Sequence, residues 1–183
     1  MKRRVVVVTI LVLAFGVLPG RLMAQAPAVV PATVDGIVNY TRVHSGLAAG
    51  GVLSAEALAS LKALGFKTVI DLRGATEPGV AEEKAAVRAL GLRYVHVPVS
   101  PSTFSLGDVE AVAKVLDDAG AAPVLLHCTS SNRVGAVWAV IQVQKGLSLE
   151  AAEAEGRKFG LKSEAMVEAM KRVAAEAVPP GKR

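Results

Sequence analysis

From residue 67 onward, short apolar runs of strand length alternate with stretches of helical pattern, and this alternation constrains the fold more than any other feature. The apolar runs are 68–72, 93–99 and 124–127, and the helical stretches between them are 82–90 and 105–116. Such alternation is typical of βα units over a mostly parallel sheet. The uncharged last run is expected at the centre of a sheet covered on both faces. The pattern predicts an α/β fold in three layers, with a sheet of about four or five strands flanked by helices.

The regions on either side of this pattern are also predicted to be structured. Residues 36–53 have the pattern of two short strands joined by a turn that contains glycine, and Ser54 is placed to cap a helix that ends near Leu64. The stretch after Arg133 is apolar on nearly every side, so it is predicted to form a buried helix. Two further helices are expected, over 148–159 and 163–177.

The N-terminal segment has the features of a signal peptide. Lys2, Arg3 and Arg4 precede an apolar run that is too short to span a bilayer comfortably, and cleavage after Ala24 satisfies the small-residue rule. We therefore expect a periplasmic or secreted protein with no other membrane segment. The predicted organisation is a signal peptide over 1–24, a flexible tether over 25–35, one domain over 36–178 and a loose tail over 179–183.

Charge and residue composition exclude several classes of function. Removing residues 1–24 removes four basic residues and no acidic one, so the net charge falls from +5 to +1. There is no basic stripe with interleaved aromatic residues, and nucleic acid is not an expected partner. His44 and His96 stand alone, so the sequence predicts neither a metal site nor a cofactor. The sequence does not indicate an oligomeric state.

The single cysteine, Cys128, lies at the carboxyl end of the predicted central strand. A short polar turn follows it, and then the buried helix begins near Arg133. Ligands bind at this edge of open α/β sheets, and a helix N-terminus offers unpaired N–H groups and a positive dipole. We therefore predict an anion site formed by Thr129, Ser130, Ser131, Asn132 and Arg133. The same field favours a thiolate, so Cys128 is expected to be nucleophilic near neutral pH, and Arg133 to clamp two anion oxygens.

His127-Cys128-x4-Arg133, followed by a helix that contains Gly135-Ala136, resembles the loop of the bacterial dual-specificity-phosphatase-like family that is sometimes fused to β-lactamase-like hydrolases. Other segments occur in the order which that family shows, over roughly residues 36–160. They are Asn39-Tyr40-x-x-Val43, Gly50-Gly51, the run from Gly65 to Arg73 with Glu77, and Val97-Pro98-Val99. The resemblance implies the cysteine-phosphatase-like fold and a small-molecule or protein phosphomonoester as substrate.

The resemblance also implies a phosphocysteine mechanism, in which Cys128 attacks phosphorus while Arg133 and the loop amides hold the oxygens. Three departures from the usual pattern predict slow turnover. The loop has four residues between cysteine and arginine, where the tyrosine-phosphatase signature has five. Ser131 stands where glycine is common and is strained if its φ is positive. Val134 stands where Ser or Thr usually helps the cysteine to leave.

The general acid is the least defined part of the predicted site. Residues 98–107, where such phosphatases place an aspartate, contain no carboxylate. Asp108 is the nearest candidate, although its spacing from Ser105 favours a helix cap. Asp71 ends a strand at the same edge of the sheet, but pairing with Arg73 or with backbone is an equally good role. His127 is predicted to orient the loop or to lie in the core.

Two other functions are also compatible with the sequence. A sulfurtransferase of the rhodanese type also carries a cysteine on a short loop at a strand end, where backbone amides hold a persulfide. A catalytically impaired protein that only binds an anion or a phosphorylated ligand would keep the loop and lack the acid. The Asp71-Leu72-Arg73 segment favours the phosphatase, and the missing carboxylate in 98–107 favours the binding protein.

Overall fold

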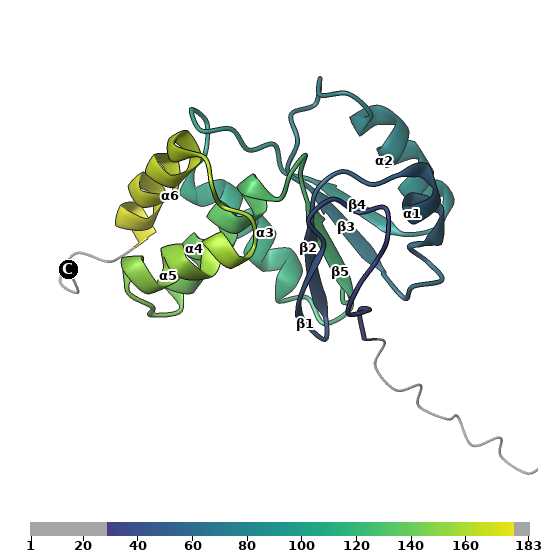
Figure 1. Cartoon of the computed structure of the whole chain (residues 1–183), viewed down its shortest axis with the longest axis horizontal. Coiled ribbons are helices and arrows are strands. Elements are labelled where there is room, and N and C mark those ends of the chain that lie inside the picture. The colour runs from purple at the N-terminus through teal and green to yellow at the C-terminus, as the bar shows by residue number, and fades with distance from the viewer. Residues whose placement is uncertain (1–28, 178–183) are drawn as a thin grey trace, which may run out of the picture.

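The computed structural model describes residues 29–177 as an α/β fold in three layers. Figure 1 shows the sheet in the middle, with α1 and α2 against one face and α3 to α6 against the other. The strands are β1 (Thr41–His44), β2 (Leu47–Gly50), β3 (Thr68–Asp71), β4 (Arg93–His96) and β5 (Val124–His127). The helices are α1 (Ala55–Ser60), α2 (Val80–Ala89), α3 (Leu106–Leu116), α4 (Asn132–Gln144), α5 (Leu149–Lys158) and α6 (Glu164–Ala177).

The five strands form one sheet in the order β1-β2-β5-β3-β4. Strand β5 lies at its centre and is parallel to both neighbours, and only β1 is antiparallel to the strand beside it. Every residue of β5 is buried, as predicted from its uncharged sequence. The predicted fold class, layer arrangement and strand number are therefore confirmed.

Two apolar cores cover the two faces of the sheet. The larger core joins β5 to α3, α4 and α6, and the smaller core packs α1 and α2 against the opposite face. Helix α4 is buried as predicted, and it packs closely on α5 where two glycines meet. A Cβ atom at Gly156 would lie 2.5 Å from the carbonyl oxygen of Gly135, so neither helix tolerates a side chain at this crossing.

Some boundaries differ from the predicted ones for local reasons. The strand predicted over 93–99 ends at His96, although Val97 and Val99 still donate their N–H groups to the carbonyls of Asp71 and Leu72. Helix α2 begins at Val80, two residues earlier than predicted, because Gly79 takes a left-handed conformation at its N-cap. The described part of the predicted tether packs on the domain, since Val30 is 1% exposed and donates its N–H to the Ser45 carbonyl.

The predicted signal peptide, the first residues of the predicted tether and the predicted tail lie outside the described residues. Among residues 29–177, no helix is long and apolar enough to cross a membrane.

Candidate active site

The loop from Cys128 to Arg133 joins the carboxyl end of β5 to the N-terminus of α4 (Figure 1). Cys128 is 1% exposed and its N–H donates to the Gly50 carbonyl. Helices α1, α3 and α5 each have a serine side chain that caps the N-terminus, whereas α4 has no side-chain cap. The first N–H groups of α4 are therefore left for a ligand, which is the arrangement that an anion requires.

The segment after β2 holds one side of this loop. Val52 donates its N–H to the Thr129 carbonyl at 3.0 Å, and the Asn39 amide donates to the Ser130 carbonyl at 3.1 Å. A Cβ atom at Gly51 would lie 2.6 Å from the Thr129 carbonyl, so the close approach of the two segments requires glycine here. At Gly50 the constraint is a different one, since a Cβ atom there would lie 2.7 Å from Cγ2 of Ile37.

Ser131 is the strained residue of the loop. Its φ is +67°, which is the positive value for which strain was predicted at this position. A left-handed conformation costs a residue with a side chain about 1–2 kcal/mol. The Ser131 hydroxyl donates to the Phe159 carbonyl at 2.9 Å, which partly offsets that cost. Gly160 lies against Ser131 and leaves no space for a Cβ atom of its own.

The Asn132 side chain points away from the loop interior and joins α4 to the start of α6. Its Oδ1 accepts from the backbone N–H groups of Lys162 and Ser163, at 2.8 and 3.2 Å. Its Nδ2 donates to the Ser163 hydroxyl. The Asn132 side chain therefore fixes the neighbouring loop, so only its backbone N–H remains for the predicted anion site.

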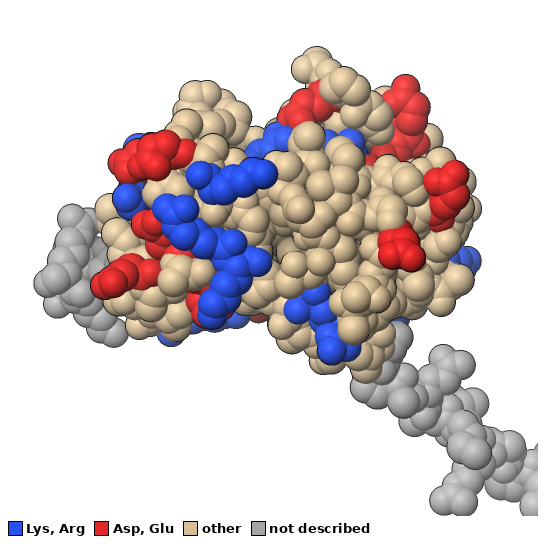
Figure 2. Space-filling view, viewed as in Figure 1, with Lys and Arg blue, Asp and Glu red and all other residues tan. Residues whose placement is uncertain are grey.

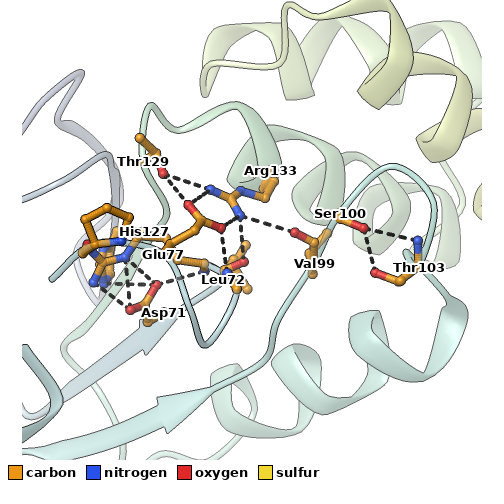
Figure 3. A network of polar contacts seen from close by, with 12 residues as sticks. Asp71, Leu72, Glu77, Val99, Ser100, Thr103, His127, Thr129 and Arg133 are labelled. Carbon is orange, nitrogen blue, oxygen red and sulfur yellow. Dashed lines mark hydrogen bonds and ion pairs between the residues drawn. The ribbon is translucent and has the colours of Figure 1, made fainter. Parts of the chain in front are cut away.

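Arg133 is held by four other residues of the site (Figure 3). Its two terminal nitrogens donate to both carboxylate oxygens of Glu77, at 2.5 and 2.9 Å. It also donates to the Thr129 hydroxyl at 2.8 Å and to the carbonyls of Leu72 and Val99 at 3.3 Å. These bonds hold both terminal nitrogens and fix the plane of the guanidinium at the loop.

The charges of this pair are reinforced by their contacts. The hydrogen bonds from Arg133 lower the pKa of Glu77 to about 2 against the opposing effect of burial, with further help from the Gly74 N–H and Thr129. The hydrogen bond to Glu77 in turn raises the pKa of Arg133 although burial opposes this, and the nearby Cys128 sulfur adds to the effect. Arg133 is thus a permanent cation close to the cysteine. Glu77 belongs to the segment that resembles the family, but its contact with Arg133 was not predicted.

A second group of charged residues lies behind the loop and is sealed from solvent. Asp71 accepts hydrogen bonds from Arg73 at 2.7 Å and from the Tyr94 hydroxyl at 2.8 Å, and Arg73 also pairs with Glu83 at 2.8 Å. Burial opposes the charge of Asp71, but the hydrogen bonds from Arg73 and the other nearby groups outweigh it and lower the pKa of this carboxyl. His127 Nε2 is 2.8 Å from Glu83, without the alignment of a hydrogen bond.

Asp71, Glu83 and His127 could each offer one ligand atom to a metal ion, within 4.8 Å of one another. However, the Arg73 guanidinium already binds both carboxylates, so a metal ion here would face that positive charge at short range. The group is therefore better described as a buried ion-pair cluster. Glu83 and Tyr94 reach this cluster from α2 and β4, so no local sequence pattern predicts their contributions.

The remaining predicted residue, Asp108, forms the capping box at the start of α3. Its Oδ2 accepts from both the N–H and the hydroxyl of Ser105, at 2.9 Å each. The loop residues from Cys128 to Arg133 are thus brought together as predicted. Asp71 lies in the buried cluster and Asp108 in the helix cap.

A pocket of about 360 Å³ lies beside the loop, between Asn39 to Thr41 and the segment 157–162. Arg157, Lys158 and Lys162 contribute to its wall. Lys and Arg side chains form a band over the half of the molecule that contains α5, next to a hollow in the surface (Figure 2). Arg157 and Lys158 pair with Glu153 and Glu155 of α5, neither of which lines the pocket, so the charged side chains of the wall are all cationic.

A thiol at the end of the central strand, an uncapped helix N-terminus and a fixed arginine are, in this three-layer fold, the features of a cysteine-type phosphatase. A family model agrees: residues 40–145 match the phosphatase-like domain of beta-lactamase hydrolase-like protein. The chain belongs to this family.

Individual relatives support this assignment. A beta-lactamase hydrolase-like protein of Agrobacterium fabrum is 32% identical over 100 residues, which cover 52% of this chain and 23% of that protein. The chain thus spans about a quarter of the length of the curated relatives that it matches. Among solved structures, P. aeruginosa TpbA superposes with a TM-score of 0.61 at 24% identity, covering 83% of this chain and 92% of TpbA. The core catalytic domain of the PP-IP phosphatase SIW14 of S. cerevisiae gives 0.62 at 16% identity, covering 77% and 88%.

Proposed function

We propose that the chain hydrolyses phosphate monoesters through a covalent phosphocysteine on Cys128. The observation that carries this proposal is the position of the thiol below the uncapped N-terminus of α4, close to the guanidinium of Arg133. Both features stabilise a thiolate and the charge that develops on a transferred phosphoryl group. A structure of a cysteine-to-serine variant of TpbA holds phosphotyrosine, which fits a phosphomonoester as the ligand class.

The roles follow from the contacts of each residue. The Cys128 thiolate is the nucleophile, and the N–H groups of the loop from Thr129 to Arg133 bind the equatorial oxygens. Arg133 offers its Nε–H and its positive charge to the phosphoryl group, while Glu77 and Thr129 hold the terminal nitrogens. Val134 brings no hydroxyl group to help the cysteine leave, so breakdown of the phosphocysteine is the slow step.

The decisive experiment compares the wild type with Cys128→Ser and Arg133→Lys on an aryl phosphate. Cys128→Ser removes the nucleophile and should abolish hydrolysis. Arg133→Lys should lose most of it, because an ammonium group cannot replace the planar fork. Acid quenching during turnover should trap phosphate on Cys128 in the wild type only.

The other functions give different results in the same experiment. A sulfurtransferase would transfer sulfur from thiosulfate to cyanide and would form a persulfide on Cys128. A protein that only binds an anion would bind phosphate and hydrolyse nothing. Wild-type hydrolysis no faster than that of Cys128→Ser would exclude the phosphatase.

We further propose that residues 1–24 direct export and are removed, so that the protein works in the periplasm or outside the cell. The support is the charge and apolar pattern of this segment. N-terminal sequencing of the exported protein should begin at Gln25. Recovery of the uncleaved chain in the membrane fraction would contradict this.

A further inference from the structure

The segment between β4 and α3 borders the site but carries no acid. Arg133 donates to the Val99 carbonyl, which places this segment beside the loop (Figure 3). Its polar side chains are hydroxyls, and Ser100 bonds those of Ser102 and Thr103. Residues 98–107 include no carboxylate and no histidine. Hydroxyl groups do not release protons near neutral pH, so this segment cannot protonate a leaving group.

The carboxylates on the neighbouring elements are already bound. Asp71 is fully buried against Arg73 and Tyr94, and Glu83 is 5% exposed against Arg73. The Oδ2 of Asp108 accepts hydrogen bonds from Ser105 in the cap of α3. Asp71 and Glu83 are therefore sealed away from a bound phosphoester, and Asp108 is tied to the start of α3 through one of its oxygens.

Glu77 is the carboxylate closest to the reacting groups, and it is held as an anion. Both of its oxygens accept hydrogen bonds from Arg133, one also accepts from the Gly74 N–H, and the other accepts from the Thr129 hydroxyl. Its pKa of about 2 leaves it without a proton at neutral pH. Glu77 can therefore orient Arg133 but cannot act as the general acid.

We infer, on the basis of the proposed phosphocysteine chemistry, that this site selects phosphoryl donors whose leaving group departs as a stable anion. Aryl phosphates and phosphoanhydrides belong to this class. Alkyl phosphates such as phosphoserine do not, because an alkoxide must be protonated as it leaves. A general acid contributes about 10²- to 10⁴-fold to such a step, and the alkyl esters lose this factor here.

The reaction balances without a proton from the protein. The Cys128 thiolate forms the S–P bond while the P–O bond breaks, and the leaving oxygen keeps the bonding pair and departs as an anion. Water then forms a new P–O bond while the S–P bond breaks, which regenerates the thiolate and releases phosphate. The proton that water loses goes to solvent, where it balances the released anion.

The test measures kcat/KM of the full chain for aryl phosphates of increasing phenol basicity, together with a phosphotyrosine peptide, a phosphoserine peptide and pyrophosphate. This parameter reports formation of the S–P bond, and it should fall at least about 100-fold from the most activated aryl ester to the phosphoserine peptide. The rates on the phosphotyrosine peptide and on pyrophosphate show whether the site prefers aryl phosphates or phosphoanhydrides. Equal rates for phosphoserine and activated aryl esters would overturn the inference while leaving the proposed function intact. No hydrolysis of any donor would refute both.

A variant pair tests whether a hidden acid is present. Asp108→Asn removes the nearest acid in the chain after residue 98, and Asp117→Asn removes an exposed carboxylate at the other end of α3 as a matched control. Both variants should keep the wild-type dependence of kcat/KM on leaving-group basicity. A steeper dependence in Asp108→Asn alone would identify Asp108 as the acid and overturn the inference.

Discussion

Two arginines of this protein are each held by carboxylates, but in opposite surroundings. Arg73 is 3% exposed and pairs with Asp71 and Glu83, whose side chains are 0% and 6% exposed. Arg133 pairs with Glu77 through two hydrogen bonds as well, yet the side chains are 15% and 33% exposed. Figure 3 shows Asp71 and His127 of the buried cluster on the left, and Glu77 and Arg133 to their right.

The difference in exposure decides what each ion pair contributes. A charge that is sealed from water is stabilised only by its partners, and removing one partner leaves a buried charge uncompensated. The Arg73 cluster therefore ties β3 to β4, β5 and α2 behind the loop. A partly exposed pair contributes less to stability, but it can hold a cation in position for a ligand. The Glu77–Arg133 pair is of this second kind.

The largest effect is expected from Arg73→Met, which leaves Asp71 and Glu83 without their cation. The free energy of unfolding should fall by about 3–5 kcal/mol, measured by urea denaturation at neutral pH. Arg93→Met is the matched control, because its pair with Asp118 is about half exposed on both sides and should lose less than about 1 kcal/mol. Equal losses in the two variants would remove the distinction between sealed and open pairs.

Glu77→Gln should separate activity from stability. The amide keeps the size of the side chain but can no longer accept from both nitrogens of Arg133, so the fork loses its fixed orientation. We expect kcat/KM on an aryl phosphate to fall by up to about 100-fold, while stability changes by no more than about 1 kcal/mol. Glu82→Gln, at an exposed position of α2, is the control and should change neither quantity. Normal activity with a large loss of stability would show that Glu77 stabilises the fold and does not position Arg133 for activity.

The smallest effect is a pH dependence of stability. The pKa of Glu77 is about 2 in the folded chain against an ordinary value of 4.5, so the carboxylate stabilises the fold above pH 4.5. This contribution is lost as the pH falls from 4.5 towards about 2, because the unfolded chain takes up the proton first on acidification. The difference in unfolding free energy between wild type and Glu77→Gln should shrink over this range in urea titrations. A difference that stays constant down to about pH 3 would contradict the pairing.

Much of the fold could be predicted from the sequence because its signals are local. The uncharged run before Cys128, the serine caps and the apolar stretch after Arg133 each act over a few residues, and the structure has the corresponding strand, caps and buried helix. The position of the thiol between a strand end and a helix start could be predicted for the same reason, since it is defined by contiguous residues. The strain at Ser131 is local in the same way, because it depends on the φ angle of that one residue.

Only the tertiary structure decided which partner each charged side chain meets. Glu77 reaches Arg133 across 56 positions of the chain, and Tyr94 and Glu83 reach the ends of β3 and β5 from other elements. For Asp71 and Asp108 the sequence left two roles open, and the structure has the contacts of the alternatives to the acid, a pair with Arg73 and a helix cap. Hydrogen bonds and ion pairs depend on distances below about 4 Å, and those distances are set by how the strands and helices pack, which no local pattern encodes.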